Sequence, residues 1–353
     1  MPATLANKLR LGIIGCGWAT ANLHVPALRR IPQYELIAVA DMDRTRVEEF
    51  GSRWGVRYRF GDARALIEHS EVDAVAVCVP PGDHASVATA AIKAGKHVFI
   101  EKPLTLTVDH ADRLLECASG TRAKVLVGFN LRWHRLVRQA KAMLNAHRLG
   151  PLILMRTVFT NALCHDERIV AWRRHRSCGG GVIQDLAVHH FDLWRYLLAS
   201  EVQEISVSAR SERWQDEAAV ISARMTNGML VSSVFASGTS ERHELECYGE
   251  AGSLSVSCYH YDGLRMFSPR KRALPGLIRE VAAKAMTLPR MVNRMRSGGE
   301  ISASYESQWR HFLDCVQTGA PVGCSVLDGK RAVELAVAAT ESLLTGQSVS
   351  LKQ

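Results

Sequence analysis

The sequence lacks long apolar runs and paired cysteine motifs. No stretch of the 353 residues approaches the ~18 consecutive apolar residues that a membrane span needs. Residues 1–10 contain no apolar run typical of a secretory signal. The nine cysteines are scattered and none forms a Cys-x-x-Cys pair, so neither a zinc ribbon nor a thioredoxin-type site is indicated. We therefore expect a cytoplasmic protein with reduced cysteines and no transmembrane segment.

Acidic residues are scarce in one segment. The formal net charge is +9, and between residues 264 and 296 nine Lys and Arg accompany Glu280 alone, a surplus of +8. The rest of the chain is close to neutral, so it lacks the broad basic field of a nucleic-acid-binding protein, and we expect no nucleic-acid partner.

Within this basic insertion, about 264–298, apolar residues recur every three to four positions and Pro289 interrupts them, which predicts two short helices. Three alternatives stay open for the insertion. Its apolar side packs on the sheet or a sister subunit, its basic side binds an anionic substrate, or the segment contacts an acidic membrane surface.

Strand-like and helix-like segments alternate over the first 128 residues. Short runs rich in Val and Ile suit strands buried on both faces, and the amphipathic stretches between them have the length of helices. The expected strands are 9–15, 35–40, 73–79, 97–100 and 123–127, and the expected helices are 21–30, 44–54, 84–94 and 108–118. Asp83 and Thr107 are the predicted N-caps of the last two helices. This alternation predicts an α/β domain with a doubly wound parallel sheet.

After Gly128 the pattern changes to short strands with short connections. We expect strands at 152–159, 205–210, 218–225, 229–235, 243–248, 254–259 and 349–351, and helices at 131–149, 182–198 and 331–344. Asn227-Gly228 is a strong hairpin signal, and short connections require antiparallel pairing. The second half therefore predicts an α+β domain with an open antiparallel sheet and helices on one face.

A glycine turn follows the first predicted strand. Gly15 allows a tight turn, and Gly17 lets the backbone approach a pyrophosphate at the N-terminus of the next helix, although Thr20 replaces the third glycine of this fingerprint. Asp41, 24 residues after Gly17, ends the second strand, where a carboxylate binds an adenosine ribose and repels a 2′-phosphate. Each residue alone is an ordinary turn residue, but their order predicts dinucleotide binding. NAD is favoured, and Arg44 leaves NADP open.

Two other segments carry residues suited to proton transfer. Lys102, in Glu101-Lys102-Pro103, ends a predicted parallel strand on the side of the sheet where ligands bind. Asp185 and His189 follow a run of three glycines and are four residues apart, so on a helix both project from one face. Taken alone, each motif favours a simpler interpretation: a solvated lysine at a strand end, and a local pair on a helix surface. No third ligand is evident, so we expect no metal.

Together these motifs resemble the glucose–fructose oxidoreductase, inositol dehydrogenase and rhizopine-catabolism (Gfo/Idh/MocA) oxidoreductases, over essentially the whole chain. The shared features are the turn at Gly15 and Gly17, Ala40-Asp41, Pro80-Pro81 with His84, Glu101-Lys102-Pro103, Gly128-Phe129-Asn130 with Arg132, residues 179–189 and Asp328-Gly329. Thr20 departs from a usual small residue and Ala187 from a frequent glycine. The resemblance implies a Rossmann domain at 1–129, a substrate-binding and oligomerisation domain at 130–353, and a homo-oligomer formed through the antiparallel sheet.

The resemblance also implies roles for individual residues. Lys102, Asp185 and His189 match the family's catalytic trio, and with Arg132 they would bind the substrate. The cofactor contacts would come from Gly15, Gly17, Trp18, Ala19, Asp41, Arg44, Pro80, His84, Glu101, Lys102 and Asn130. A cis peptide bond is expected between Lys102 and Pro103.

The implied reaction transfers a hydride between a secondary hydroxyl of a sugar, cyclitol or sugar derivative and NAD. Histidine side chains ordinarily titrate near neutrality, so His189 suits the role of base, while Lys102 would stabilise charge on the reacting oxygen and Asp185 would hold a neighbouring hydroxyl. Two alternatives stay open: a non-catalytic ligand-sensing regulator on the same fold, and an NAD-dependent glycosidase that oxidises its sugar only transiently.

Overall fold

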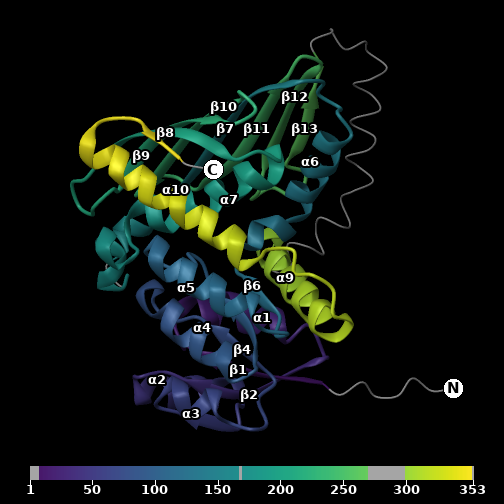
Figure 1. Cartoon of the computed structure of the whole chain (residues 1–353), viewed down its shortest axis with the longest axis vertical. Coiled ribbons are helices and arrows are strands. Elements are labelled where there is room, and N and C mark those ends of the chain that lie inside the picture. Colours follow the sequence, from purple (N-terminus) through teal and green to yellow (C-terminus); the bar gives the residue numbers. More distant parts are fainter. Residues whose placement is uncertain (1–7, 167–168, 269–298, 352–353) are drawn as a thin grey trace, which may run out of the picture. The chain divides into compact units, whose positions relative to one another are not determined.

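The computed structural model describes residues 8–166, 169–268 and 299–351, which form two compact units (Figure 1). The first unit comprises Met1–Phe129 and Tyr305–Glu334, and the second comprises Asn130–Ser304 and Leu335–Gln353. Tyr305–Glu334, assigned from sequence to the second domain, instead belongs to the first unit. The predicted helices of the basic insertion lie outside the described residues.

The first unit is built on a six-stranded parallel sheet in the order β3-β2-β1-β4-β5-β6. Its strands are β1 (Leu9–Ile14), β2 (Tyr34–Ala40), β3 (Tyr58–Phe60), β4 (Ala74–Val77), β5 (His97–Ile100) and β6 (Val125–Val127). The four residues of β4 are all buried, as expected for a strand covered on both faces. This is the predicted doubly wound sheet, and the reversal of strand order beside β1 is where such sheets bind ligands.

Most helical elements of the first unit lie between these strands in the chain, and the last two come from the later segment Tyr305–Glu334. They are η1 (Thr20–His24, a π-helical turn), α1 (Val25–Leu28), α2 (Arg44–Trp54), α3 (Ala63–Ile67), η2 (Pro81–Asp83, a 3-10 turn), α4 (His84–Lys93), α5 (Val108–Ser119), most of α9 (Gly299–Thr318) and the start of α10 (Val326–Thr345). Thr107 caps α5 as predicted, because its side chain accepts the N–H of His110 at 3.3 Å. The predicted Asp83 cap is wrong. Its φ and ψ of −97° and −7° lack the extended backbone of an N-cap, and η2 leads directly into α4.

The second unit is built on an eight-stranded sheet in the order β13-β12-β11-β7-β10-β9-β8-β14. Its strands are β7 (Leu152–Asn161), β8 (Val202–Arg210), β9 (Ala218–Met225), β10 (Leu230–Ser237), β11 (Arg242–Gly249), β12 (Gly252–Ser257), β13 (Leu264–Phe267) and β14 (Val349–Ser350). The pairing is antiparallel, as predicted, except between β7 and β10, which run parallel. Four short helical turns, one α-helix and two strands separate β7 from β10 in sequence, so no hairpin constrains their direction.

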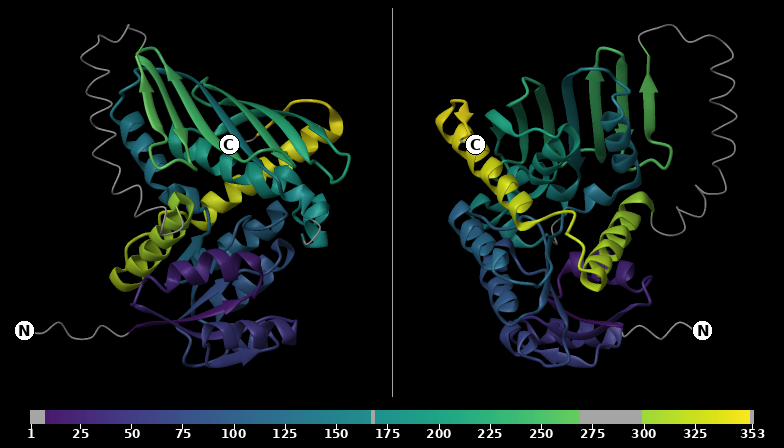
Figure 2. Two further views of the ribbon diagram at one scale, coloured as in Figure 1. Left: turned by 180° about the vertical axis from the view of Figure 1, so that it is seen from behind. Right: turned by 45° about the vertical axis from the view of Figure 1, so that its right-hand side comes forward.

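Helices cover one face of the second sheet. The predicted helix at 131–149 divides into the 3-10 turn η3 (Asn130–Trp133) and α6 (Arg135–Asn145), and the predicted helix at 182–198 begins as the π-helical turn η7 (Ile183–Ala187) before α7 (Val188–Leu198). Side chains of α6, α7 and α10 pack with the inward residues of the strands into one apolar core. Seen from behind in Figure 2, the other face of this sheet is covered by none of the described helices.

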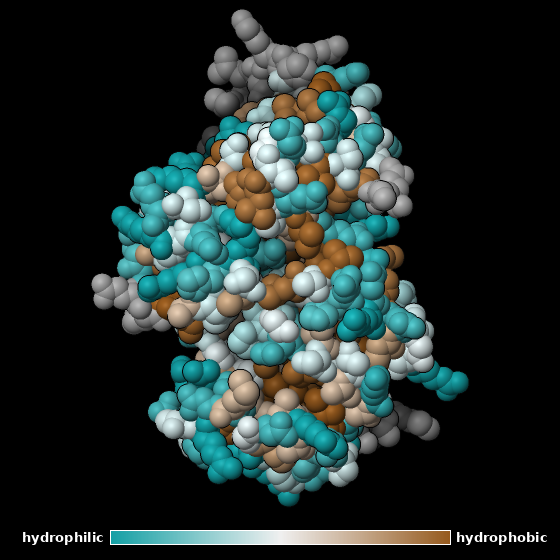
Figure 3. All heavy atoms as spheres, turned by 60° about the vertical axis from the view of Figure 1, so that its left-hand side comes forward, coloured by the Kyte–Doolittle hydropathy of each residue, from teal (hydrophilic) through white to brown (hydrophobic). Residues whose placement is uncertain are grey.

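The uncovered face carries apolar side chains in its centre. Val234 of β10 lies between Val158 of β7 and Val220 of β9 in the strand register, and Val220 and Val234 are 51% and 41% exposed. On the face of the molecule drawn in Figure 3, apolar side chains likewise form patches between polar ones. None of the helices in the described ranges is long and apolar enough to cross a membrane.

Candidate active site

The glycine turn after β1 is shaped for a close approach of backbone and ligand. Gly15 has φ +101°, and a Cβ there would lie 2.4 Å from the carbonyl oxygen of Cys78, so only glycine fits. A Cβ at Gly17 would meet no atom within 4 Å, so the space in front of this residue is open. Thr20 takes over part of the missing third glycine's role, because its hydroxyl donates to the Gly15 carbonyl at 2.7 Å and closes the turn.

The carboxylate of Asp41 is fixed in place beside this turn. Its Oδ2 accepts the N–H of Cys16 at 2.9 Å, and its Oδ1 accepts the N–H of Asp43 at 3.0 Å. The guanidinium of Arg46 lies 3.5 Å from Oδ2, whereas Arg44 lies beside Gly61. Carboxylate oxygens each accept more than one hydrogen bond, so an oriented Asp41 retains capacity for ribose hydroxyls. The open glycine and this carboxylate fit the pyrophosphate and ribose of a dinucleotide.

Lys102 follows β5 in a turn that is held through Glu101. The Lys102–Pro103 peptide bond is cis, which confirms the prediction. The backbone N–H of Lys102 donates to Oε2 of Glu101 at 2.9 Å, and Oε1 of Glu101 lies 2.9 Å from Nε2 of His24. The indole N–H of Trp309 donates to Nδ1 of His24 at 3.2 Å. A chain of polar contacts thus runs from α9 to the lysine.

The indole N–H of Trp309 indicates which ring nitrogen of His24 accepts. An indole nitrogen only donates, so Nδ1 of His24 accepts and the ring proton is on Nε2, which faces Glu101. Burial alone would raise the pKa of Glu101, but the contacts with His24 and with the Lys102 segment outweigh it and hold that pKa below its usual value. Glu101 is therefore an ionised carboxylate whose two oxygens both face groups of its own chain.

His84 ties the turn after β4 to the Lys102 turn. Its Nδ1 lies 2.8 Å from the carbonyl oxygen of Pro103, and its Nε2 lies 2.9 Å from that of Val79, next to Pro80. Burial lowers the pKa of His84, so the ring is neutral at neutral pH and donates to one of the two carbonyls. In this structure His84 contacts backbone on both sides, and its predicted cofactor contact stays a prediction.

Asp185 and His189 lie at the start of one continuous helix of the second unit. Asp185 belongs to η7 and His189 to the first turn of α7, and their side chains are 17% and 9% exposed. The ring of Phe159 lies edge-on to His189, with centroids 6.1 Å apart. Arg173 donates to Oδ2 of Asp185 at 2.7 Å. The predicted pair therefore shares one part of the second unit, with a guanidinium that the sequence did not indicate.

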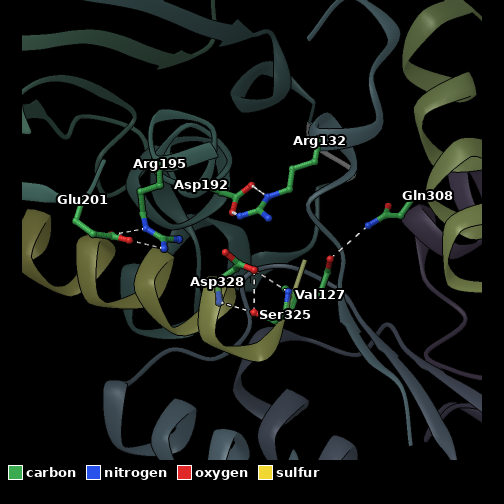
Figure 4. Close-up of polar contacts among 8 residues, drawn as sticks. All are labelled: Val127, Arg132, Asp192, Arg195, Glu201, Gln308, Ser325 and Asp328. Atoms are coloured by element: carbon green, nitrogen blue, oxygen red, sulfur yellow. Dashed lines mark hydrogen bonds and ion pairs between the residues drawn. The ribbon is translucent and has the colours of Figure 1, made fainter. Parts of the chain in front are cut away.

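Arg132 and Asn130 also make contacts inside the second unit. Arg132 donates through Nε and Nη2 to the two oxygens of Asp192, at 2.8 and 2.6 Å (Figure 4). The amide of Asn130 donates to Ser304 Oγ at 2.8 Å. The predicted contacts of Arg132 with substrate and of Asn130 with cofactor stay predictions. Figure 4 also shows the Ser325–Asp328 contact that starts α10 in the first unit, at the Asp328-Gly329 motif.

A group of buried histidines lies behind His189. Nδ1 of His190 lies 2.7 Å from Thr157 Oγ1, and its Nε2 lies 3.1 Å from Nε2 of His243. Burial lowers the pKa of His190 to about 3, and burial with the nearby His190 and His134 holds the pKa of His243 well below its usual value. These rings are neutral packing groups. In the described ranges, no three His, Cys, Asp or Glu side chains gather as ligands of a metal ion would.

The structure divides the predicted site residues between the two units. Those on the first unit are Gly15, Gly17, Trp18, Ala19, Asp41, Arg44, Pro80, His84, Glu101 and Lys102, and those on the second are Asn130, Arg132, Asp185 and His189. Sequence reasoning missed His24, Arg46, Arg173, Asp192 and Trp309. Of these, Asp192 alone had a local signal, because it lies three residues after His189 on the same predicted helix.

The first unit has a parallel sheet with a glycine turn and an oriented carboxylate, Asp41. The second unit is an α+β domain with Asp185 and His189 at the start of a helix. This combination defines a two-domain dinucleotide-dependent oxidoreductase. Comparison with known families agrees. Residues 9–129 match the family model described as "Oxidoreductase family, NAD-binding Rossmann fold", and residues 137–255 match the GFO/IDH/MocA C-terminal domain. The chain belongs to the GFO/IDH/MocA oxidoreductase family, and NAD is its cofactor.

Relatives of similar length support this assignment. The chain is 27% identical to myo-inositol 2-dehydrogenase of Thermotoga maritima, over 98% of this chain and 99% of the relative. It is 23% identical to the scyllo-inositol 2-dehydrogenase (NAD(+)) of Bacillus subtilis, over 98% and 97% of the two chains. Among solved structures, scyllo-inositol dehydrogenase from Lactobacillus casei with bound cofactor NAD(H) and scyllo-inositol has the same fold, with a TM-score of 0.79, 19% identity and coverage of 98% and 99%.

Proposed function

We propose that the protein oxidises a secondary hydroxyl of a sugar, cyclitol or sugar derivative, with NAD accepting the hydride. The observation that carries this proposal is the placement of Asp185 and His189 four residues apart where η7 continues into α7, with Asp185 17% exposed and His189 9% exposed. Full-length likeness to relatives named as inositol dehydrogenases supports the substrate class.

His189 is proposed to accept the hydroxyl proton. Imidazole titrates close to neutral pH, so it takes up a proton and returns it to solvent without a large barrier. The edge of Phe159 against His189 limits how far the ring turns. The cofactor, when bound, takes the hydride from the carbon that carries the hydroxyl.

Lys102 is proposed to donate a hydrogen bond to the reacting oxygen and to stabilise negative charge on it. Its backbone is held by Glu101, so its side chain starts from a fixed position. Asp185 is proposed to accept a hydrogen bond from a neighbouring hydroxyl of the substrate, which orients the carbon to be oxidised. Polyols and sugars offer such neighbouring hydroxyls.

NAD rather than NADP is proposed as the working cofactor on the strength of Asp41. The carboxylate repels a 2′-phosphate, and two backbone N–H groups hold it in position. Arg46 contacts this carboxylate, with Nη1 3.5 Å from Oδ2 of Asp41. Arg46 and Arg44 are the two residues that would soften the preference.

A screen of cyclitols, sugars and nucleotide sugars, read by the absorbance of reduced nicotinamide, tests the function. Oxidation of at least one polyol by the wild type is expected, with severe loss of turnover in Lys102→Met and His189→Ala and near-normal NAD binding. A ligand-sensing regulator would bind sugars without producing NADH, and a glycosidase would cleave a glycoside without net NADH. Normal turnover in either variant would disprove the role given to that residue.

We also propose that the protein self-associates through the uncovered face of its second sheet. Val158, Val220 and Val234 form an apolar row across β7, β10 and β9, with ion pairs such as Arg156–Glu246 beside it. A second copy of the same face would bury this row against itself, as a two-fold interface requires.

A further inference from the structure

Arg173 contacts the acid of the proposed catalytic pair. It lies in η5 (Ala171–Arg174), a short 3-10 turn, and its Nη1 donates to Oδ2 of Asp185 at 2.7 Å. The two side chains are 25% and 17% exposed, so water screens this ion pair only in part. Asp185 is the carboxylate proposed to bind the substrate. The guanidinium of Arg173 affects both the orientation of this carboxylate and its charge.

The loop that carries Arg173 is fastened to a buried acid. Arg176, three residues on, donates through Nε and Nη2 to both oxygens of Asp216, each at 2.6 Å, and Asp216 is fully buried. The backbone N–H of Arg176 donates to the side chain of Gln215 at 2.8 Å, and the N–H of Gln215 donates to the carbonyl of Arg174 at 3.2 Å. These bonds fix the backbone on the C-terminal side of Arg173.

The glycine run before Asp185 brings the two segments together. A Cβ at Gly180 would lie 2.2 Å from the carbonyl oxygen of Arg173, so the backbone of Arg173 packs directly on this glycine. Gly181 has φ +76°, and a Cβ there would lie 2.6 Å from the carbonyl oxygen of Gln215. Backbone packing therefore places Arg173 beside the start of the helix, and the ion pair does not depend on the attraction of two mobile side chains.

We propose that Arg173 is a positioning residue that holds Asp185 as an ionised hydrogen-bond acceptor for a substrate hydroxyl. The proposal rests on the proposed function and deepens it, because it gives Asp185 and His189 different roles. Asp185 accepts a hydrogen bond throughout, and His189 takes the proton. The charged or titratable groups on the neighbouring segments include His189, Arg174, His175 and the Arg176–Asp216 pair. The strand β10, which also packs on η7, carries no ionisable residue.

The first test compares Arg173→Gln with Arg174→Gln, which removes an exposed cation from the same loop. For Arg173→Gln we expect an approximately tenfold higher KM for the polyol, because Asp185 loses a charge-assisted hydrogen bond that orients it. The acid limb of its kcat/KM profile is expected to move to higher pH, because a carboxylate that loses a neighbouring cation takes up a proton more readily. NAD affinity stays unchanged, and Arg174→Gln behaves as the wild type. In Arg173→Lys the positive charge is kept but the planar donor is lost. We therefore expect the acid limb of the pH profile to return close to that of the wild type, while the KM stays raised.

The second test does not need activity. Urea unfolding of Arg173→Gln, Asp185→Asn and the double variant forms a cycle whose single changes are expected to be non-additive at neutral pH and additive at acidic pH. Additive effects at both pH values would overturn the ion pair. A wild-type KM and pH profile in Arg173→Gln would overturn the positioning role while leaving the proposed function intact. A wild type that oxidises no polyol would overturn both.

Discussion

The guanidinium of Arg132 and the carboxylate of Asp192 form two parallel hydrogen bonds inside the second unit, with side chains only 8% and 1% exposed. Asp192 lies three residues after His189 on α7, and Arg132 belongs to η3. The ring of Tyr196 lies 5.2 Å from the guanidinium, on the same helix as Asp192. The pair therefore joins the first turn of the second unit to the helix that carries the proposed base.

Removing one partner of this pair is expected to destabilise the protein strongly. Arg132→Met or Asp192→Asn leaves a buried polar or charged group uncompensated, and each should lower the free energy of unfolding by about 3–5 kcal/mol. The double variant Arg132→Met/Asp192→Leu should recover much of this loss, since no charge remains to be desolvated. Urea denaturation measures both effects. The exposed Arg64–Glu68 pair is the control, and its removal should change stability little.

The preference for NAD should depend on Asp41. In Asp41→Ala the ribose loses its carboxylate, and NAD affinity should fall by about 2 kcal/mol, or ~30-fold. Binding of NADP should weaken less or improve, because Arg46 remains. Titration of protein fluorescence with each cofactor measures this. Asp43→Asn keeps the cap on α2 and should leave NAD affinity unchanged. Equal losses for NAD and NADP in Asp41→Ala would contradict the assignment.

His24 should matter for turnover more than for cofactor binding. His24→Phe removes the group facing Glu101 and leaves a buried carboxylate less satisfied, at an expected loss of about 2 kcal/mol in unfolding free energy. Because Glu101 also holds the backbone of Lys102, kcat should fall while NAD affinity is retained. Trp309→Phe, which removes the indole donor but keeps an aromatic ring beside Phe99, is the milder companion variant. An unchanged kcat in His24→Phe would argue against the contact chain.

Acid should destabilise the second unit through its buried histidines. The folded-state pKa of His190 is about 3 and that of His243 is also lowered, so between these values and the usual ~6.5 the unfolded chain binds more protons than the folded one. Stability is therefore highest above the unfolded pKa and is lost as pH falls below it, at about 1.4 kcal/mol per pH unit for each histidine. Urea denaturation of the wild type and His190→Gln between neutral and mildly acidic pH tests this. A variant with the same slope as the wild type would show that His190 does not contribute.

Self-association should fail when charge enters the apolar row on the sheet. Val234→Asp places a carboxylate at the centre of the face, opposite Val158 and Val220, and should shift the protein to a smaller species in light scattering. Leu344→Glu, at a more exposed apolar position near the end of α10, is the control and should keep the wild-type mass. A monomeric wild type would refute the interface.

Much of the fold can be predicted from hydrophobic periodicity and local sequence motifs. The helix at Arg44–Trp54 and the strand at Ala218–Met225 have the bounds that the sequence predicts, because amphipathic spacing and alternating burial are local properties. The parallel pairing of β7 with β10 has no local signal, since it depends on which distant strands meet. The helix α9 was also missed. Its buried Trp309 and Phe312 serve contacts with Phe99, which is about two hundred residues earlier.

The site shows the same division. The glycines, Asp41, Lys102, Asp185 and His189 stand in motifs whose spacing has a chemical reason. The residues that contact them stand in no such motif. Arg173, for example, contacts Asp185 from a loop whose path cannot be predicted from the sequence. Arginines are frequent in that loop, and nothing in their order marks the one that contacts the acid.

The return of Tyr305–Glu334 to the first unit limits how the protein can be dissected. A truncation after Phe129 would retain the glycine turn and all six strands, yet it would lack Trp309, whose ring stacks on Phe99 at 4.3 Å and whose indole fixes the His24 proton. Such a fragment would expose the ring of Phe99, and His24 beside the buried carboxylate of Glu101 would lose its indole donor. The dinucleotide-binding unit thus consists of two separate segments of the sequence. During synthesis on the ribosome, its second segment emerges only after most of the second unit.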